Sequence, residues 1–323
     1  MDEIRQSELF YNLRAFAILS VAYAHALDLQ NVLLARVGAL LGLIGVPVFL
    51  ICSGYYYKPV SLDKNFFYKK FQTIVAPWLI WGTFAFILTV ILNDKIQSGN
   101  HLFTDYLLYL SGYHTWLYFV PIYLITIFLF QWIKPSRGML FLSMGITAIS
   151  CCITFFFKLD FGITPFQNPL NWIGFYAMGI CLKNHLDAII QKKMIFWSAG
   201  ILSVVAGVYI VLSEWTVSYW HPASILFELS AFGLLLLAAY GVKGKFFGVL
   251  GMNSYVLYFL HMQLGIASAN VIFRCLPFSS DVATFGLKPS VVILISMFYV
   301  WLISLACKRL GLGNGLRYLG IKW

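Results

Sequence analysis

Long apolar runs separated by short polar connections dominate this chain. A transmembrane helix needs about 20 consecutive, mostly apolar residues. Ten stretches come close to that requirement, at approximately 9–28, 37–57, 71–92, 115–133, 138–157, 170–186, 195–213, 222–242, 249–272 and 290–309. A membrane β-barrel would instead show alternating segments of about ten residues, and these runs do not alternate. The pattern predicts an all-α membrane protein, a bundle of about ten transmembrane helices.

Composition supports this class and excludes a soluble domain. Only 11% of the residues are charged and 61% are hydrophobic, whereas a soluble domain carries about 25% charged residues. The runs leave little chain for anything else, so we expect residues 1–323 to form a single integral-membrane domain. The first run resembles a signal peptide, but its leader MDEIRQSE is net acidic, whereas a signal peptide begins with a positively charged region. We therefore expect a retained first helix.

The net charge of +10 is distributed as a topology signal. With ten spans both termini lie on one side, and the loops of that side hold sixteen of the 22 Lys and Arg residues, against five in the opposite loops. Cytoplasmic loops carry an excess of Lys and Arg, so we expect both termini in the cytoplasm. The same distribution makes a nucleic-acid partner improbable. The sequence gives no indication of an oligomeric state.

The polar connections and the cysteines add little chemistry. The longest connections are 58–70, predicted inside, and 93–114 and 273–289, predicted outside; the apolar stretch 102–112 is too short to span and is predicted to be re-entrant or interfacial. We see no internal repeat of the kind that many transporters show. The six cysteines form no Cys-x-x-Cys pair and no metal-ligand spacing with histidine. We therefore expect no metal site and no disulfide.

Two ionisable residues lie inside the first apolar run. Arg14 and His25 are eleven residues apart, close to three full helical turns, so they share one helix face about 16 Å apart. Asp28 follows on a neighbouring part of that face, where it could orient the imidazole. A snorkelling arginine and an interface histidine would explain each residue alone, but ionisable residues inside a membrane are costly. The pair favours a thin ligand that is anionic at the Arg14 end, with His25 as a general base.

The residues around this pair resemble a known family. LRAFAILSVAYAH resembles the motif of an arginine, ten residues and a histidine in the first helix of the acyltransferase-3 family, integral-membrane acyltransferases of which many acylate bacterial surface glycans. Five further stretches resemble later segments of that family in the same order: GVPVFLICSGYYY, FYKKFQTIVAPWLIW, HTWLYFVPIYL, PLNWIGFYAMGICL and GMNSYVLYFLHMQL. The resemblance runs from about residue 5 to 265 and is closest to the short branch without an extra C-terminal domain.

The resemblance implies a multi-pass enzyme of the bacterial inner (cytoplasmic) membrane. It would transfer an acetyl or other short acyl group from cytoplasmic acyl-CoA, its co-substrate, to a hydroxyl of a surface or lipid-linked carbohydrate. Arg14, Lys69 and Lys70 would then bind the nucleotide end of acyl-CoA, and Ser53 would be a candidate donor to the oxyanion. His25 would act as the base, tuned by Asp28.

One departure from the family concerns the donor. Many members carry an Arg-x-x-Arg pair before the third-helix proline, where this chain has Lys69 and Lys70, then Gln72 and Thr73. Lysine attracts phosphate as a point charge and lacks the bidentate fork of arginine. The detailed grip on the donor is therefore expected to differ.

Other polar residues have competing interpretations. His114, Trp116 and His261 are candidates for binding the acceptor; Trp116 could equally be an interface anchor and His261 a buried histidine of the bundle. Ser53-Gly54 could serve close helix packing. Glu228 could pair with a cation that the sequence does not identify, and His221, at a helix end, is expected to be solvated.

Two other functions remain open from the sequence. A transporter or flippase of a glycan intermediate would also need polar residues in the membrane, but it would need no acyl donor. A purely structural scaffold would leave the Arg14 and His25 pair without an explanation.

Overall fold

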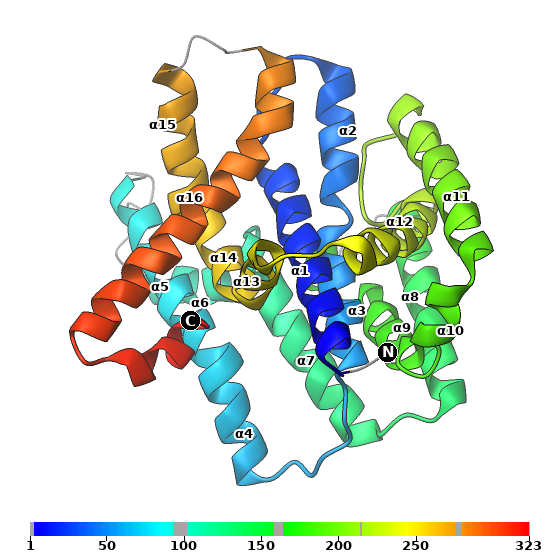
Figure 1. Ribbon diagram of the computed structural model, residues 1–323, viewed down its shortest axis with the longest axis horizontal. Helices are drawn as coiled ribbons and strands as arrows, with labels where there is room; N and C mark the ends of the chain where they lie inside the picture. The colour runs from blue at the N-terminus through cyan, green and yellow to red at the C-terminus, as the bar shows by residue number, and fades with distance from the viewer. Residues whose placement is uncertain (1–2, 93–101, 158–163, 214, 276–279, 323) are drawn as a thin grey trace.

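The computed structural model describes residues 3–92, 102–157, 164–213, 215–275 and 280–322, and every regular element within these ranges is a helix (Figure 1). The α-helices are α1 Glu3–Ala26, α2 Val32–Gly42, α3 Gly45–Tyr55, α4 Lys64–Lys70, α5 Ala76–Leu92, α6 Leu102–Ser111, α7 Phe119–Ile133, α8 Arg137–Phe157, α9 Ile173–Leu182, α10 Leu186–Gln191, α11 Lys193–Leu212, α12 Pro222–Gly241, α13 Lys245–Met252, α14 Ser254–Leu260, α15 Ala267–Cys275 and α16 Asp281–Arg309. Two π-helical segments, Phe71–Val75 and His261–Ile266, continue α4 into α5 and α14 into α15. Short 3₁₀ turns cover Trp116–Tyr118, Pro165–Gln167, Pro169–Asn171 and Gly313–Leu319. The all-α prediction is confirmed.

Eight helical stretches of the described chain are long and apolar enough to cross a membrane. They are Val32–Tyr55, Lys64–Ile91, Trp116–Ile133, Arg137–Phe157, Met194–Leu212, Pro222–Gly241, Ser254–Cys275 and Asp281–Arg309. The two remaining predicted runs correspond to α1, which has 24 residues, and to the shorter apolar helix Pro169–Leu182. A multi-pass membrane protein is therefore confirmed, while the number ten and the cytoplasmic termini stay predictions.

Several predicted boundaries were wrong. The connection 58–70 is helical from Lys64, because the Asp63 side chain accepts a hydrogen bond from the Phe66 amide and caps α4. The last helix begins at Asp281 rather than 290, because Ser280 caps it and Pro289 is tolerated inside it. The predicted run 249–272 is divided at Asn253, between α13 and α14. The stretch 102–112 forms α6 as far as Ser111 and packs on α5, and its re-entrant or interfacial placement stays a prediction.

Helix α1 lies in the middle of the molecule (Figure 1), packed against α2, α3, α12, α13, α14, α16 and the π-helical segment His261–Ile266. Small residues allow these close contacts: Ala15, Ala17 and Ala22 are fully buried. A Cβ atom at Gly251 of α13 would lie 1.8 Å from the Tyr11 carbonyl oxygen, so only glycine fits there. Arg14 and His25 are therefore carried by a helix that packs against elements from both halves of the chain.

Helices α3 and α9 approach each other through a pair of glycines. A Cβ at Gly54 would lie 2.0 Å from the Tyr176 carbonyl oxygen, and a Cβ at Gly179 would lie 2.1 Å from that of Ile51. The packing interpretation of the Ser53-Gly54 pair is thus confirmed for the glycine.

The C-terminal segment, residues 313–322, folds back onto α5 and the π-helical segment Phe71–Val75 (Figure 1). Trp81 Nε1 donates to the Leu319 carbonyl at 2.9 Å, and Gln72 Nε2 donates to the Tyr318 hydroxyl at 2.7 Å. Buried Asn253 bonds the backbone of Lys322 twice: it donates to the carbonyl at 3.1 Å and accepts from the amide at 2.9 Å. These bonds place the last residues of the chain beside the interior of the bundle.

Candidate functional site

A cavity of about 290 Å³ opens between α1, α3, α7, α14, the π-helical segment Phe71–Val75 and the C-terminal segment. Its lining includes four cations, Arg14, Lys70, Arg317 and Lys322, and no Asp or Glu. Arg317 and Lys322 reach solvent, whereas Arg14 and Lys70 are half-buried. The cavity therefore concentrates positive charge at its solvent end without any acidic side chain to balance it.

Arg14 has its hydrogen-bonding capacity largely unused. Its guanidinium contacts the Cys52 thiol and lies 5.6 Å from the centre of the Tyr56 ring, and no carboxylate of the described chain pairs with it. Although the Lys322 side chain reaches water, the surrounding protein and, secondly, the charge of Arg14 lower the pKa of Lys322. Two cations held together without a counter-ion favour an anionic ligand.

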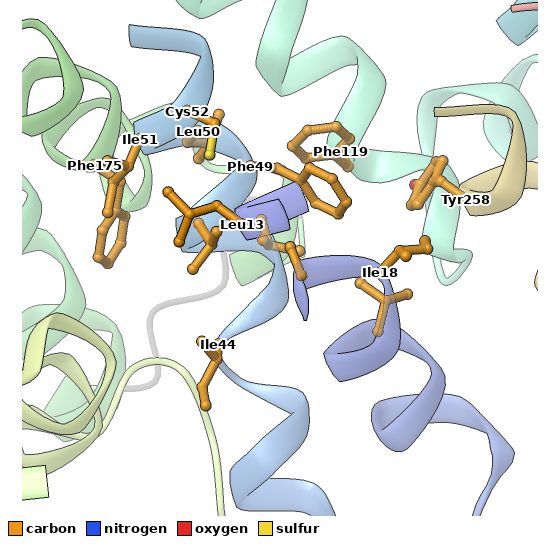
Figure 2. Close-up of a cluster of buried hydrophobic side chains, with 14 of the residues drawn as sticks. Leu13, Ile18, Ile44, Phe49, Leu50, Ile51, Cys52, Phe119, Phe175 and Tyr258 are labelled. Atoms are coloured by element: carbon orange, nitrogen blue, oxygen red, sulfur yellow. The ribbon is translucent and has the colours of Figure 1, made fainter. Parts of the chain in front are cut away.

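The inner end of the cavity is aromatic. The Phe49 and Phe119 rings lie 6.0 Å apart, and the Phe119 and Tyr258 rings 5.5 Å apart, measured between centroids. Figure 2 shows these three side chains, from α3, α7 and α14, next to one another in the buried cluster around α1. A molecule that is anionic at one end and slender and apolar at the other would match both ends of this cavity.

The structure brings together most of the predicted donor residues. Arg14, Ser53 and Lys70 line the cavity, whereas Lys69 is exposed and is not part of the lining. Thr73 lines it as well. Sequence reasoning missed Arg317 and Lys322, which counted only toward the cytoplasmic charge excess. Their place in the site depends on the hydrogen bonds that fold the C-terminal segment back.

His25 contacts a second histidine. The centroids of the His25 and His261 rings are 5.5 Å apart, with the planes inclined by 43°. His261 is fully buried; its Nδ1 lies 2.7 Å from the Tyr258 carbonyl oxygen, and its Nε2 has no hydrogen-bond partner in the described chain. Because Tyr258 also lines the cavity, the histidine pair lies one helical turn beyond the cavity wall.

The predicted contact of Asp28 with His25 stays a prediction. Asp28 is exposed just beyond the end of α1, and within the described ranges no hydrogen bond joins it to His25. Its charge acts instead on Lys288 of α16.

The two residues proposed to bind the acceptor from the 114–116 stretch differ in position. His114 is exposed, has a left-handed φ of 54° and packs against the Tyr113 ring. The Trp116 carbonyl accepts a hydrogen bond from the Tyr258 hydroxyl, and its buried Nε1 has no partner in the described part of the chain. Trp116 is thus linked to His261 through Tyr258, which contacts both residues. His114 is exposed and does not belong to this group.

Two expectations about other polar residues were wrong. Glu228 is only 1% exposed, and no cation pairs with it among the described residues; its carboxyl lies near the hydroxyls of Tyr118 and Tyr219 instead. His221 is buried rather than solvated, because it packs against the Phe155 ring and its Nδ1 accepts a hydrogen bond from the Ala223 amide at the start of α12.

Comparison with known proteins identifies a family. The model of a family described as an acyltransferase domain matches residues 10–309, from the second turn of α1 to the last residue of α16. No curated protein and no solved structure matches the chain. The matched region contains Arg14, His25, His261 and the inner wall of the cavity. The chain therefore belongs to the acyltransferase-3 family and is a membrane acyltransferase.

Proposed function

We propose that this protein transfers an acetyl or other short acyl group from cytoplasmic acyl-CoA to a hydroxyl of a surface or lipid-linked carbohydrate, in the bacterial inner membrane. The observation that carries the proposal is a cavity lined by four cations, with no carboxylate among its described lining residues, whose aromatic inner wall ends one helical turn from His261, the residue that contacts His25.

The donor matches the cavity in charge and in shape. Coenzyme A has phosphates at its nucleotide end and its thioester at the end of a slender pantetheine arm. Phosphate oxygens accept strong, charge-assisted hydrogen bonds from Arg and Lys. In the proposed complex the nucleotide stays at the solvent end, and the arm enters the cavity of about 290 Å³.

The C-terminal segment adds cations to the donor site, where this chain lacks the Arg-x-x-Arg pair of many family members. Of the two polar residues that come after Lys70 and Phe71, Thr73 lines the cavity, and Gln72 binds Tyr318 of that segment. We infer that Arg317 and Lys322 supply positive charge in place of the Arg-x-x-Arg pair of many other members. Arg317 also restores a guanidinium fork, which lysine lacks.

The reaction follows from the position of His25. His25 takes the proton of the acceptor hydroxyl while the oxygen attacks the thioester carbonyl. The C–O bond forms, the C–S bond breaks, and the departing thiolate takes the proton from His25. Ser53 lines the cavity and is the proposed donor to the carbonyl oxygen as negative charge develops on it. Trp116, which contacts Tyr258 through its carbonyl, is proposed to border the route of the carbohydrate.

Mass spectrometry of the host's surface glycans tests this function. We expect glycans from cells that lack the gene to be lighter by one acyl group per modified residue. The wild-type gene should restore that mass, and the His25→Gln gene, expressed at the same level, should not. Unchanged acylation together with reduced surface glycan would instead indicate a transporter.

A further inference from the structure

The buried histidine of the pair has a defined tautomer. His261 Nδ1 lies 2.7 Å from the carbonyl oxygen of Tyr258. A carbonyl oxygen only accepts hydrogen bonds, so Nδ1 carries the proton of the neutral ring. Nε2 is then a bare acceptor, and it is fully buried without a donor among the described residues.

A buried acceptor without a partner costs free energy, so a donor is expected to reach it at some stage of function. Two rings contact His261, those of Tyr258 and His25. The Tyr258 hydroxyl already donates to the Trp116 carbonyl. Of these two rings in the described chain, that of His25 is the one with a donor still available, its ring N–H.

We propose that His261 is a positioning residue for His25: its Nε2 accepts a hydrogen bond from His25 when His25 becomes protonated during acyl transfer. The role in transfer depends on the proposed function, whereas the contact between the two rings does not.

In this proposal His25 takes the proton from the acceptor hydroxyl and gives it to the departing thiolate, and His261 neither gains nor loses a proton. Neutral His25 has one N–H and one bare nitrogen, and the bare nitrogen takes the proton of the acceptor hydroxyl. Both nitrogens of His25 then carry protons, and one of them donates to Nε2 of His261. When the thiolate takes the proton, His25 is neutral again. His261 stays neutral throughout, so the site holds a charge only while the reaction proceeds.

The local backbone supports a functional role for this position. π-Helical turns are rare and occur frequently at functional sites. Both π-helical segments of the described chain border this site: Phe71–Val75 contributes Thr73 and Ile74 to the cavity, and His261–Ile266 begins at His261 itself. Asp28, the other candidate for orienting His25, is exposed and makes no hydrogen bond to it within the described chain.

Nitrogen NMR tests the contact without any substrate. The purified protein, labelled with ¹⁵N-histidine in lipid nanodiscs, is titrated with acid, and the two rings are assigned with His25→Gln and His261→Gln. We expect the Nε2 resonance of His261 to move from that of a bare nitrogen to that of a hydrogen-bonded one as His25 gains a proton. That change should be absent in His25→Gln. An Nε2 resonance that stays unchanged, or that shows His261 itself taking the proton, overturns the proposal.

Transfer kinetics test the role. Acetyl-CoA labelled with ¹⁴C in the acetyl group is added to membranes that contain the wild-type protein. The rate at which radioactivity enters the glycan of these membranes is then measured. His261→Phe keeps a ring and removes both nitrogens; because hydrogen bonds to charged groups are the strong ones, we expect its maximal rate to fall about 10- to 100-fold. The acetyl-CoA concentration for half-maximal rate should stay within about twofold, because the donor site is intact. His261→Gln, which keeps an acceptor oxygen, should recover part of the rate.

The controls separate the possible failures. His185→Phe, at an exposed histidine outside the site, should transfer label normally, and size-exclusion chromatography should show equal amounts of folded protein. Wild-type rates in His261→Phe overturn the proposal, as does a loss that comes only from less folded protein. If wild-type membranes transfer no label from acetyl-CoA or from other labelled short acyl-CoAs, the proposed function fails, and the NMR titration still decides the contact.

Discussion

At the scale of single residues, Arg14 has the clearest need for a ligand. It lies beside Lys322 in a cavity without carboxylates. We predict that Arg14→Ala weakens coenzyme A binding by about 1.5–3 kcal/mol, the range for a hydrogen bond to a charged group. Calorimetry on the purified protein measures this. Lys69→Ala is the matched control, because Lys69 is exposed outside the cavity lining, and it should bind nearly as tightly as the wild type. Equal affinities in both variants would remove Arg14 from the donor site.

His25 is predicted to act on the rate and not on donor binding. A positioned base contributes typically 10²–10⁴-fold, so His25→Gln, which keeps size and polarity, should abolish detectable glycan acylation. Its coenzyme A affinity should stay that of the wild type, because Arg14 lies about three helical turns away. Asp28→Asn should cause an intermediate loss if Asp28 tunes the ring. Acylation at a near wild-type rate in folded His25→Gln would disprove this mechanism.

At the scale of elements, the C-terminal segment depends on Asn253. Both backbone groups of Lys322 bond the Asn253 side chain. We predict that Lys322→Ala weakens coenzyme A binding about fivefold, the effect of an ion pair that water can reach. Asn253→Ala should weaken it at least as much, because the segment loses its anchor. Lys308→Ala removes an exposed cation outside the cavity lining and should change nothing. Normal binding in Asn253→Ala, measured by the same calorimetry, would show that the segment is held by other contacts.

The same residue shows how far the sequence predicts the elements. The apolar run 249–272 predicts one continuous helix, because the polar pair Asn253 and Ser254 is too short to end an apolar run of this length. The break between α13 and α14 comes with the contact of Asn253 to Lys322, 69 residues away. Similarly, the face shared by Arg14 and His25 follows from helical spacing, but the contact of His25 with His261 depends on how α1 packs against the π-helical segment His261–Ile266. Periodicity identifies helices and faces; it does not identify the partner of a face.

At the scale of the whole molecule, orientation decides which side supplies the donor. The sixteen-to-five division of Lys and Arg predicts that residues 58–70 lie in the cytoplasm and residues 93–114 outside. We predict that an impermeant maleimide, applied to intact cells, labels Gln97→Cys and does not label Lys64→Cys. The parent protein gives the background from the native cysteines. Residues 93–101 lie outside the described ranges, so this prediction rests on the sequence. The opposite labelling would move the cation-rich end of the cavity to the outer face and exclude a cytoplasmic donor.

The account requires coenzyme A to lie in one particular cavity, with its thiol end toward the histidine pair. A cryo-EM structure of the full-length protein in nanodiscs at saturating coenzyme A tests this most directly. We predict density for the phosphates among Arg14, Lys70, Arg317 and Lys322, with the pantetheine arm passing Phe119 toward Tyr258. Coenzyme A bound elsewhere on the protein, or an empty cavity at saturation, would contradict the account.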